Sequence, residues 1–280
     1  MPVLSIVGCK ILEDEITHVL AKYRENSRII LVDDLESMGL AKKLRLLNIP
    51  FSKTPIDRVE NFLGNRGKRS GSSFLSRILR SKDNSDLVVV VKIMQLGLHR
   101  DHHLLREGVE EQIVSMTGFS DGIFLFYGLC GNSLKGIEEI TEGLECELYL
   151  LSDSDGNVVD DCISIAFGGN KRYERELNRQ HEAATLFFTP MWAAKWESAG
   201  NMTTDMVGKN CNSFFTEKIG RVIQLDTGLQ FEKEFNEKIS ELAVHFDAEV
   251  LKMQGSTDIV DSCYPKVRDD LLLKSKKKVS

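Results

Sequence analysis

Short apolar runs alternate with amphipathic stretches along most of this 280-residue chain. The apolar runs are typical of strands buried on both faces, and the stretches between them place apolar residues on one side of a helix. The predicted strands are Val3–Val7, Arg28–Val32, Leu87–Met94, Gly122–Tyr127, Glu147–Leu151, Thr185–Phe188, Arg221–Leu225 and Ala248–Lys252. The predicted helices are Ile11–Arg24, Leu35–Leu47, Asp101–Met116 and Phe231–Phe246. The alternation predicts an α/β fold, a mainly parallel sheet with helices on both faces in a Rossmann-like layered architecture.

We expect residues 1–280 to form a single domain, with a division into two subdomains as the alternative. The region 51–84 interrupts the alternation and contains Gly64–Ser73, which is rich in Gly, Ser and basic residues. It is interpreted as an insertion with a flexible basic loop. The final residues, 274–280, are expected to form a solvated basic tail.

Charge and hydropathy narrow the class of protein. Acidic side chains outnumber basic ones by 42 to 36, which disfavours a broad nucleic-acid-binding face. No apolar stretch approaches the roughly 20 residues that span a bilayer, and the N-terminus is interpreted as a first strand instead of a signal peptide. Six cysteines without a secretory leader are not expected to form a disulfide framework. These features indicate a soluble, cytoplasmic protein that binds neither membrane nor nucleic acid.

Three cysteines share one placement, because Cys9, Cys130 and Cys162 each lie beyond a predicted strand. The carboxyl ends of parallel strands meet at one sheet edge, where ligands bind near a switch in strand order. Three thiolates there would suit Zn²⁺, or an iron–sulfur cluster with one open iron. The competing interpretation treats each cysteine as a small buried hydrophobe. The remaining cysteines lack this placement and are interpreted as core or incidental thiols: Cys146, Cys211 and Cys263.

Other side chains offer alternative chemistry at the same edge. Cys130 is a candidate nucleophile, because Gly128 and Gly131 permit a tight turn and a helix start would lower the thiol pKa. His99 follows a strand and Glu13 lies four residues past Cys9, so each is a candidate fourth ligand or acid/base group.

The chain resembles a prokaryotic family known as domain of unknown function 1638. The resemblance extends over nearly the whole chain except the region around 51–84. The matching motifs are Gly8-Cys9-Lys10-Ile11-Leu12-Glu13-Asp14-Glu15, Gln95-Leu96-Gly97-Leu98-His99, Tyr127-Gly128-Leu129-Cys130-Gly131-Asn132, Asp161-Cys162-Ile163, Lys171-Arg172-Tyr173, Phe188-Thr189-Pro190-Met191-Trp192 and Leu225-Asp226-Thr227-Gly228-Leu229.

The resemblance implies a methyl-transfer context, since members are often encoded beside corrinoid-dependent methyltransferase systems. Trp192 and Tyr173 from its motifs are assigned to cofactor binding, with Trp192 placed to wall a pocket or stack on a planar cofactor. The chain departs from the family pattern at Asp160, where a histidine is usual, and at Met191, where a glycine is usual.

Together these features lead to the hypothesis of a metal-binding protein that serves corrinoid-dependent methyl transfer, with zinc or an iron–sulfur cluster on the three cysteines. The first alternative is a non-enzymatic adaptor or chaperone whose partner is a methyltransferase or corrinoid protein. A cysteine-nucleophile enzyme and a sensor of a small-molecule ligand are the others.

Overall fold

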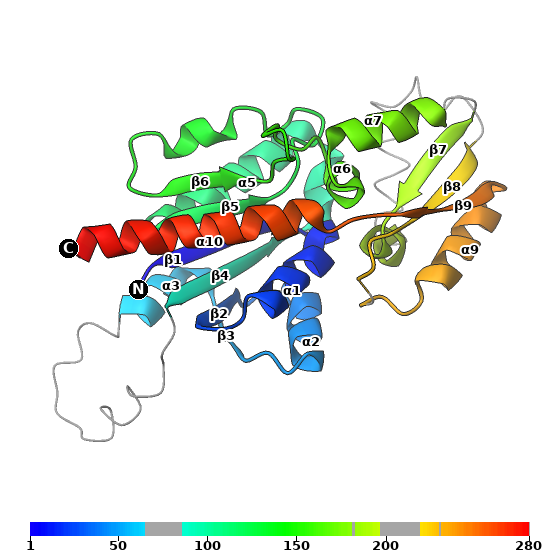
Figure 1. The fold of residues 1–280 in the computed structure, drawn as a ribbon. Helices are drawn as coiled ribbons and strands as arrows, with labels where there is room; N and C mark the ends of the chain where they lie inside the picture. Colours follow the sequence, from blue (N-terminus) through cyan, green and yellow to red (C-terminus); the bar gives the residue numbers. More distant parts are fainter. Residues whose placement is uncertain (65–85, 181–182, 197–218, 230, 280) are drawn as a thin grey trace.

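The computed structural model describes residues 1–64, 86–180, 183–196, 219–229 and 231–279, which contain two parallel sheets (Figure 1). The first sheet has the strand order β3-β2-β4-β1-β5-β6 and the second has the order β7-β8-β9. All paired strands in both sheets are parallel, which confirms the predicted α/β class. The strands are β1 Val3–Cys9, β2 Ser27–Val32, β3 Phe51–Thr54, β4 Leu87–Met94, β5 Gly122–Phe126, β6 Glu147–Leu150, β7 Ala184–Phe188, β8 Ile219–Asp226 and β9 Glu249–Gln254.

Helices cover both faces of the first sheet, with α10 in front of it and α5 behind it in Figure 1. The sheet is therefore buried on both sides, and every residue of β1 is buried. The α-helices are α1 Glu13–Lys22, α2 Met38–Leu46, α3 Ile56–Gly64, α5 His102–Thr117, α6 Cys162–Phe167, α7 Asn170–Arg179, α9 Phe235–Phe246 and α10 Asp258–Val279. Short 3₁₀ helices are η1 Lys10–Leu12, η2 Leu96–Arg100 and η3 Ile137–Thr141.

Strand order creates a switch point between β1 and β4. The chain passes from β1 to β2 on one side, whereas from β4 it crosses β1 to reach β5 on the other side. Loops that follow neighbouring strands in opposite directions leave a crevice at their carboxyl ends, where α/β proteins bind ligands. The residues at this edge are Cys9 at the end of β1, η2 after β4 and Tyr127 after β5.

The region assigned to an insertion is partly built into the first sheet. Residues 51–54 form the edge strand β3, which pairs with β2, and α3 follows it. The Gly64–Ser73 loop lies outside the described residues from position 65 onward. At the other end of the chain, the residues expected to be a solvated tail continue α10 as far as Val279.

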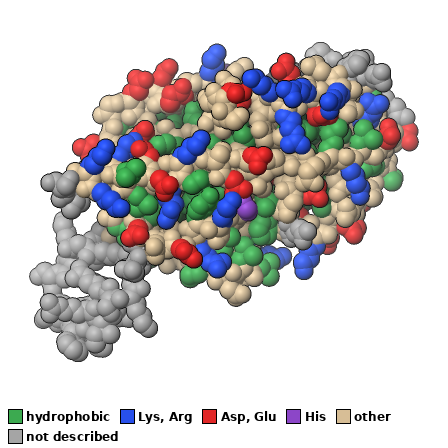
Figure 2. All heavy atoms as spheres, in the orientation of Figure 1, with side chains coloured by type: hydrophobic (Ala, Val, Ile, Leu, Met, Phe, Trp, Pro, Cys, Tyr) green, Lys and Arg blue, Asp and Glu red, His purple; other side chains and the backbone are tan. Residues whose placement is uncertain are grey.

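Figure 2 shows basic and acidic side chains intermingled on the visible face, with apolar areas between them. No helix in the described part of the chain is long and apolar enough to cross a membrane.

Candidate functional site

Parallel register places the ends of three central strands at the same level. Cys9 is paired with Met94 at the end of β4, and Gly8 is paired with Phe126 at the end of β5. Tyr127 is the next residue after β5, so its side chain leaves the sheet at the level of Cys9. Both side chains are buried.

The loop that carries Cys130 is fixed to the loop that precedes α6. The amide of Leu129 donates to the carbonyl of Val159 at 2.9 Å, and the amide of Cys130 donates to the carbonyl of Asp160 at 2.7 Å. Gly128 allows this pairing because a Cβ there would lie 2.5 Å from the backbone of Asp161. The two loops are therefore held in contact by their backbones, which brings Cys130 towards Cys162.

Cys130 also has an uncommon backbone conformation. Its φ is 48°, and the next two residues, Gly131 and Asn132, have φ of 66° and 67°. Three successive left-handed residues turn the chain back sharply. Conformations of this kind persist where surrounding structure fixes them and are found often at functional sites.

Cys162 is the first residue of α6, after an N-cap formed by Asp161, whose carboxylate accepts from the amide of Ser164 at 2.7 Å. Its sulfur accepts a hydrogen bond from the indole Nε1–H of Trp192 at 3.1 Å. Trp192 lies in the helical residues 190–196 after β7, so the second sheet contributes directly to the cysteine site.

His99 lies between two of the cysteines. Its Nε2 is 3.9 Å from the sulfur of Cys9 and 3.9 Å from the sulfur of Cys130. The ring stacks on Tyr127 with the ring centroids 6.0 Å apart. Its Nδ1 atom and the hydroxyl of Tyr127 are both buried without a hydrogen-bond partner of normal geometry. Buried polar atoms without partners are rare, and they mark a place where a further group is expected to bind.

Burial governs the ionisation of this cluster. Loss of solvation raises the pKa of the Cys9 thiol to about 12, against the opposing effect of the amides of Ile11 and Leu12. The pKa values of Cys130 and Cys162 are also raised, first by burial and then by neighbouring negative charge. Burial lowers the pKa of His99. The protein alone therefore holds neutral thiols and a neutral imidazole at pH 7.

Mutual electrostatic effects show that the three predicted cysteines lie together. Ionisation of Cys9 raises the pKa of Cys130, and ionisation of either of these raises the pKa of Cys162. After burial, the same three thiols are the main causes of the raised pKa of Tyr127. In the other direction, the nearby Tyr127 hydroxyl opposes the rise in the pKa of the Cys9 thiol.

Glu13, the other candidate ligand, lies in a separate buried charge cluster. Its two oxygens contact Lys10 at 2.6 Å and Lys43 at 2.9 Å. Lys43 also contacts Asp14 at 2.5 Å and Glu232 at 2.9 Å. The carboxylate of Glu13 is thus engaged by two ammonium groups, and it faces the lysines instead of the thiols.

Sequence reasoning had not identified Lys43, which ties α1 and α2 to the segment before α9. Its Nζ also lies 3.0 Å from the sulfur of Met191. The sequence could have indicated that Lys43 is buried, because this residue falls on the same face of α2 as Leu40, Ala41 and Leu44. A cleft of about 590 Å³ opens beside this contact, between α2 and α9.

The remaining predicted residues occupy varied positions. Tyr173 stacks on Phe167 with centroids 5.6 Å apart, and its pKa is raised by burial and then by the charges of Asp161 and Cys162, so it lies near the site. Cys146 and Cys263 are free and buried. Cys211 lies outside the described residues.

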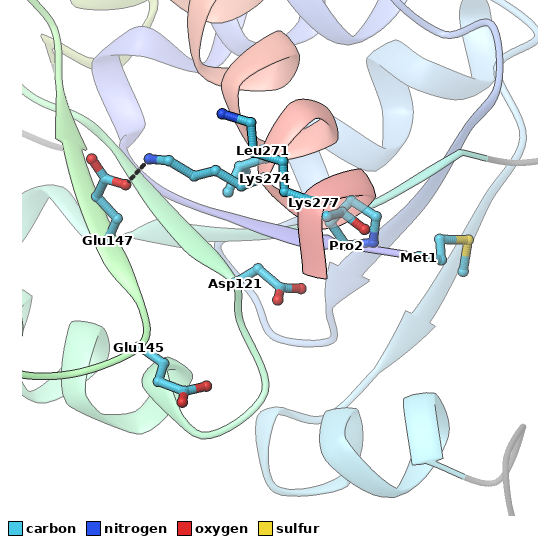
Figure 3. Close-up of a pocket in the computed structure, with 9 residues that line it drawn as sticks. Met1, Pro2, Asp121, Glu145, Glu147, Leu271, Lys274 and Lys277 are labelled. Atoms are coloured by element: carbon cyan, nitrogen blue, oxygen red, sulfur yellow. Dashed lines mark hydrogen bonds and ion pairs between the residues drawn. The ribbon is translucent and has the colours of Figure 1, made fainter. Parts of the chain in front are cut away.

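A hollow of about 320 Å³ lies at the opposite edge of the first sheet, where the strands begin (Figure 3). Pro2 precedes β1, Asp121 precedes β5, and Glu147 opens β6. Lys274 of α10 forms ion pairs with Glu147 and Asp270 there, as Figure 3 shows for Glu147. The hollow is distant in topology from the thiols, which lie at the carboxyl ends of the strands.

Residues 93–264, more than half of the chain, match the family described as Protein of unknown function (DUF1638). The chain belongs to this family. The matched region contains His99, Tyr127, Cys130, Cys162 and Trp192, whereas Cys9 precedes it on β1. No curated protein and no solved structure matches the chain.

Proposed function

We propose that this member of the family binds a soft divalent metal, with zinc as the leading candidate, between Cys9, Cys130 and His99. The proposed fourth ligand is Cys162, whose pKa is raised, after burial and Asp161, by the charges of Cys9 and Cys130. The observation that carries the proposal is the placement of His99 Nε2 at 3.9 Å from both sulfurs. Thiolate sulfur and imidazole nitrogen are the usual ligands of zinc in proteins.

The spacing can be compared with a tetrahedral zinc site. Bond lengths of about 2.3 Å to sulfur and 2.0 Å to nitrogen place the sulfur and nitrogen about 3.5 Å apart. Each distance from His99 to a sulfur would therefore have to shorten by about 0.4 Å. In the described part of the chain no three His, Cys, Asp or Glu side chains already have the spacing of a metal site. Binding thus requires a small closure of the His99 and Cys130 loops.

Groups around the ligands fit a metal centre. Metal-bound histidine commonly directs its second ring nitrogen at a backbone carbonyl. The Nδ1 atom of His99 has the backbone of Leu96 near it without a formed hydrogen bond. When His99 moves towards the sulfurs, its ring is therefore able to turn so that Nδ1 forms a hydrogen bond with the backbone of Leu96. The unpartnered hydroxyl of Tyr127 lies next to Cys9 and is placed to donate to a metal-bound sulfur.

Metal analysis tests the site. Protein purified without oxygen is expected to contain about one zinc per chain, and Cys130→Ser and His99→Gln are each expected to lose most of it. Cys146→Ser is the matched control, because Cys146 is also buried and free but lies before β6 at the other edge of the sheet. Iron with inorganic sulfide instead of zinc would assign a cluster to the same thiols. Metal-free protein, or full zinc content in Cys130→Ser, would contradict the proposal.

We further propose methyl transfer as the reaction, because the family resemblance implies it and because zinc activates a thiol by lowering its pKa. In such a step a methyl group passes from cobalt to a thiolate sulfur, a carbon–sulfur bond forms, and cobalt(III) keeps the bonding electron pair as cobalt(I). Methylcobalamin with 2-mercaptoethanol, followed by anaerobic absorbance, is the assay. Zinc-loaded protein should accelerate the loss of methylcobalamin, and Cys130→Ser should not. A rate equal to that without protein would exclude this reaction and would favour the adaptor role.

A further inference from the structure

Cys162 differs from the other two thiols in how its sulfur is held. The sulfurs of Cys9 and Cys130 share His99; Cys9 ends strand β1 of the first sheet, and Cys130 lies on the loop after β5. The sulfur of Cys162 instead accepts the indole N–H of Trp192 at 3.1 Å. A hydrogen bond to a thiolate withdraws charge from sulfur and weakens its bond to a metal.

Trp192 is firmly placed by the second sheet. Of the described residues, it alone packs against all three apolar clusters, one in the first sheet and two that include residues of the second. Its amide lies 3.3 Å from the hydroxyl of Thr189, which is buried. The preceding residue, Met191, is in contact with Lys43. The indole N–H is therefore directed by packing on both sides of the cysteine site.

We propose that Trp192 is a positioning residue that makes Cys162 the exchangeable ligand of the metal. This inference rests on the proposed metal site and names the ligand that an incoming donor displaces. In the exchange, the bond from the metal to the Cys162 sulfur breaks and a bond to the incoming donor forms. The freed thiolate keeps its hydrogen bond from Trp192. Cys9, Cys130 and His99 remain on the metal throughout.

Cobalt(II) substitution with imidazole as the incoming donor tests this assignment. The intensity of the sulfur-to-cobalt charge-transfer band follows the number of bound thiolates. Saturating imidazole should remove about one third of the band, because one thiolate of three leaves. Cys162→Ser should begin at about two thirds of the band and lose none of it.

Trp192→Phe keeps an aromatic ring but removes the indole N–H donor together with the pyrrole part of the ring, so a second Trp→Phe variant must control for the loss of volume. Trp192→Phe should need about fivefold more imidazole for half displacement, since one hydrogen bond no longer weakens the metal–sulfur bond. Trp196→Phe is the matched control, because Trp196 packs against Phe188 of β7 and Phe246 of α9 in the apolar cluster of the second sheet. Trp196→Phe should titrate like the unmodified protein.

Three results would overturn the inference. The first is an imidazole titration of Trp192→Phe identical to that of the unmodified protein. The second is a band that imidazole still reduces in Cys162→Ser, which would assign the exchange to Cys9 or Cys130. The third is failure of the unmodified protein to bind cobalt, which would overturn the metal site and this inference together. The first two leave the metal site standing.

Discussion

Glu15 offers a direct test of how burial controls charge beside the cysteine site. Its side chain is 3 % exposed, and its Oε2 atom has no hydrogen-bond partner. Burial, and then repulsion from Asp14, raises its pKa from the usual 4.5 to about 8. The folded protein therefore binds a proton at Glu15 that the unfolded chain has already released at neutral pH.

The effect on stability follows from this difference. Because the folded pKa is the higher one, stability falls as the pH rises from 4.5 to about 8 and then levels off. At pH 7 the interval above 4.5 is 2.5 pH units, and each unit corresponds to about 1.36 kcal/mol. Glu15 therefore destabilises the folded protein by about 3 kcal/mol at pH 7, and by somewhat more at pH 8.

Glu15→Gln replaces the carboxyl with a neutral group of the same shape. The free energy of unfolding, measured with urea at pH 5, 6, 7 and 8, should be close to that of the unmodified protein at pH 5. At pH 7 the free energy of unfolding of Glu15→Gln should exceed that of the unmodified protein by about 3 kcal/mol. Glu25→Gln is the control, because Glu25 is exposed in the loop before β2. A constant difference across this pH range, or none at pH 7, would refute the assigned protonation of Glu15.

Three further substitutions test other parts of the structure. Lys43→Met removes the ammonium shared by Glu13, Asp14 and Glu232, and it should destabilise the protein by about 3–5 kcal/mol at pH 8. The loss should be smaller at pH 5, because burial raises the pKa of Asp14 to about 6 and this carboxyl is then protonated, whereas urea curves like those of the exposed control Lys42→Met would argue against the cluster. Gly128→Ala places a methyl group 2.5 Å from the backbone of Asp161, and a loss of about 1–3 kcal/mol in thermal unfolding is expected; unchanged melting would mean that the two loops are not in contact. Tyr127→Phe removes a buried hydroxyl without a partner, so metal-free protein should gain about 1 kcal/mol, and a loss of similar size would show that the hydroxyl is bonded after all.

Most of the strands could be predicted because they depend on local apolar patterns, whereas the edge strand β3 fell within the region interpreted as an insertion. The approach of Cys9 and Cys130 could be predicted as well, because the carboxyl ends of parallel strands lie at one edge of a sheet. The placement of His99 beside two thiols follows from the same rule, since η2 continues from β4.

The hydrogen bond from Trp192 to Cys162 could not be predicted in this way. It depends on how the second sheet packs against the first, and nothing periodic in the sequence encodes that contact. The chain was expected to form a mainly parallel sheet, and the division of its strands between two sheets lies beyond local patterning.

The end of α10 illustrates a different limit. A run of lysines indicates solvent exposure and not the presence or absence of a helix. Lys274 is held by Glu147 and Asp270, so its ammonium contributes to the fixing of the helix against β6. The sequence pattern alone contains no information on these partners, which lie 127 and four positions away.

The chain enters and leaves the second sheet at nearly the same point. The amide of Ser256, just before α10, donates to the carbonyl of Ala166 in α6 at 2.7 Å. The segment between these two positions, here called the cassette, therefore begins and ends at neighbouring points. A short linker could join its two ends if the cassette were removed. The proposed fixed ligands Cys9, Cys130 and His99 all lie outside the cassette, whereas Trp192 lies within it. If the proposed metal site holds, replacement of one cassette by another would alter which donors reach the metal while the proposed fixed ligands stay the same.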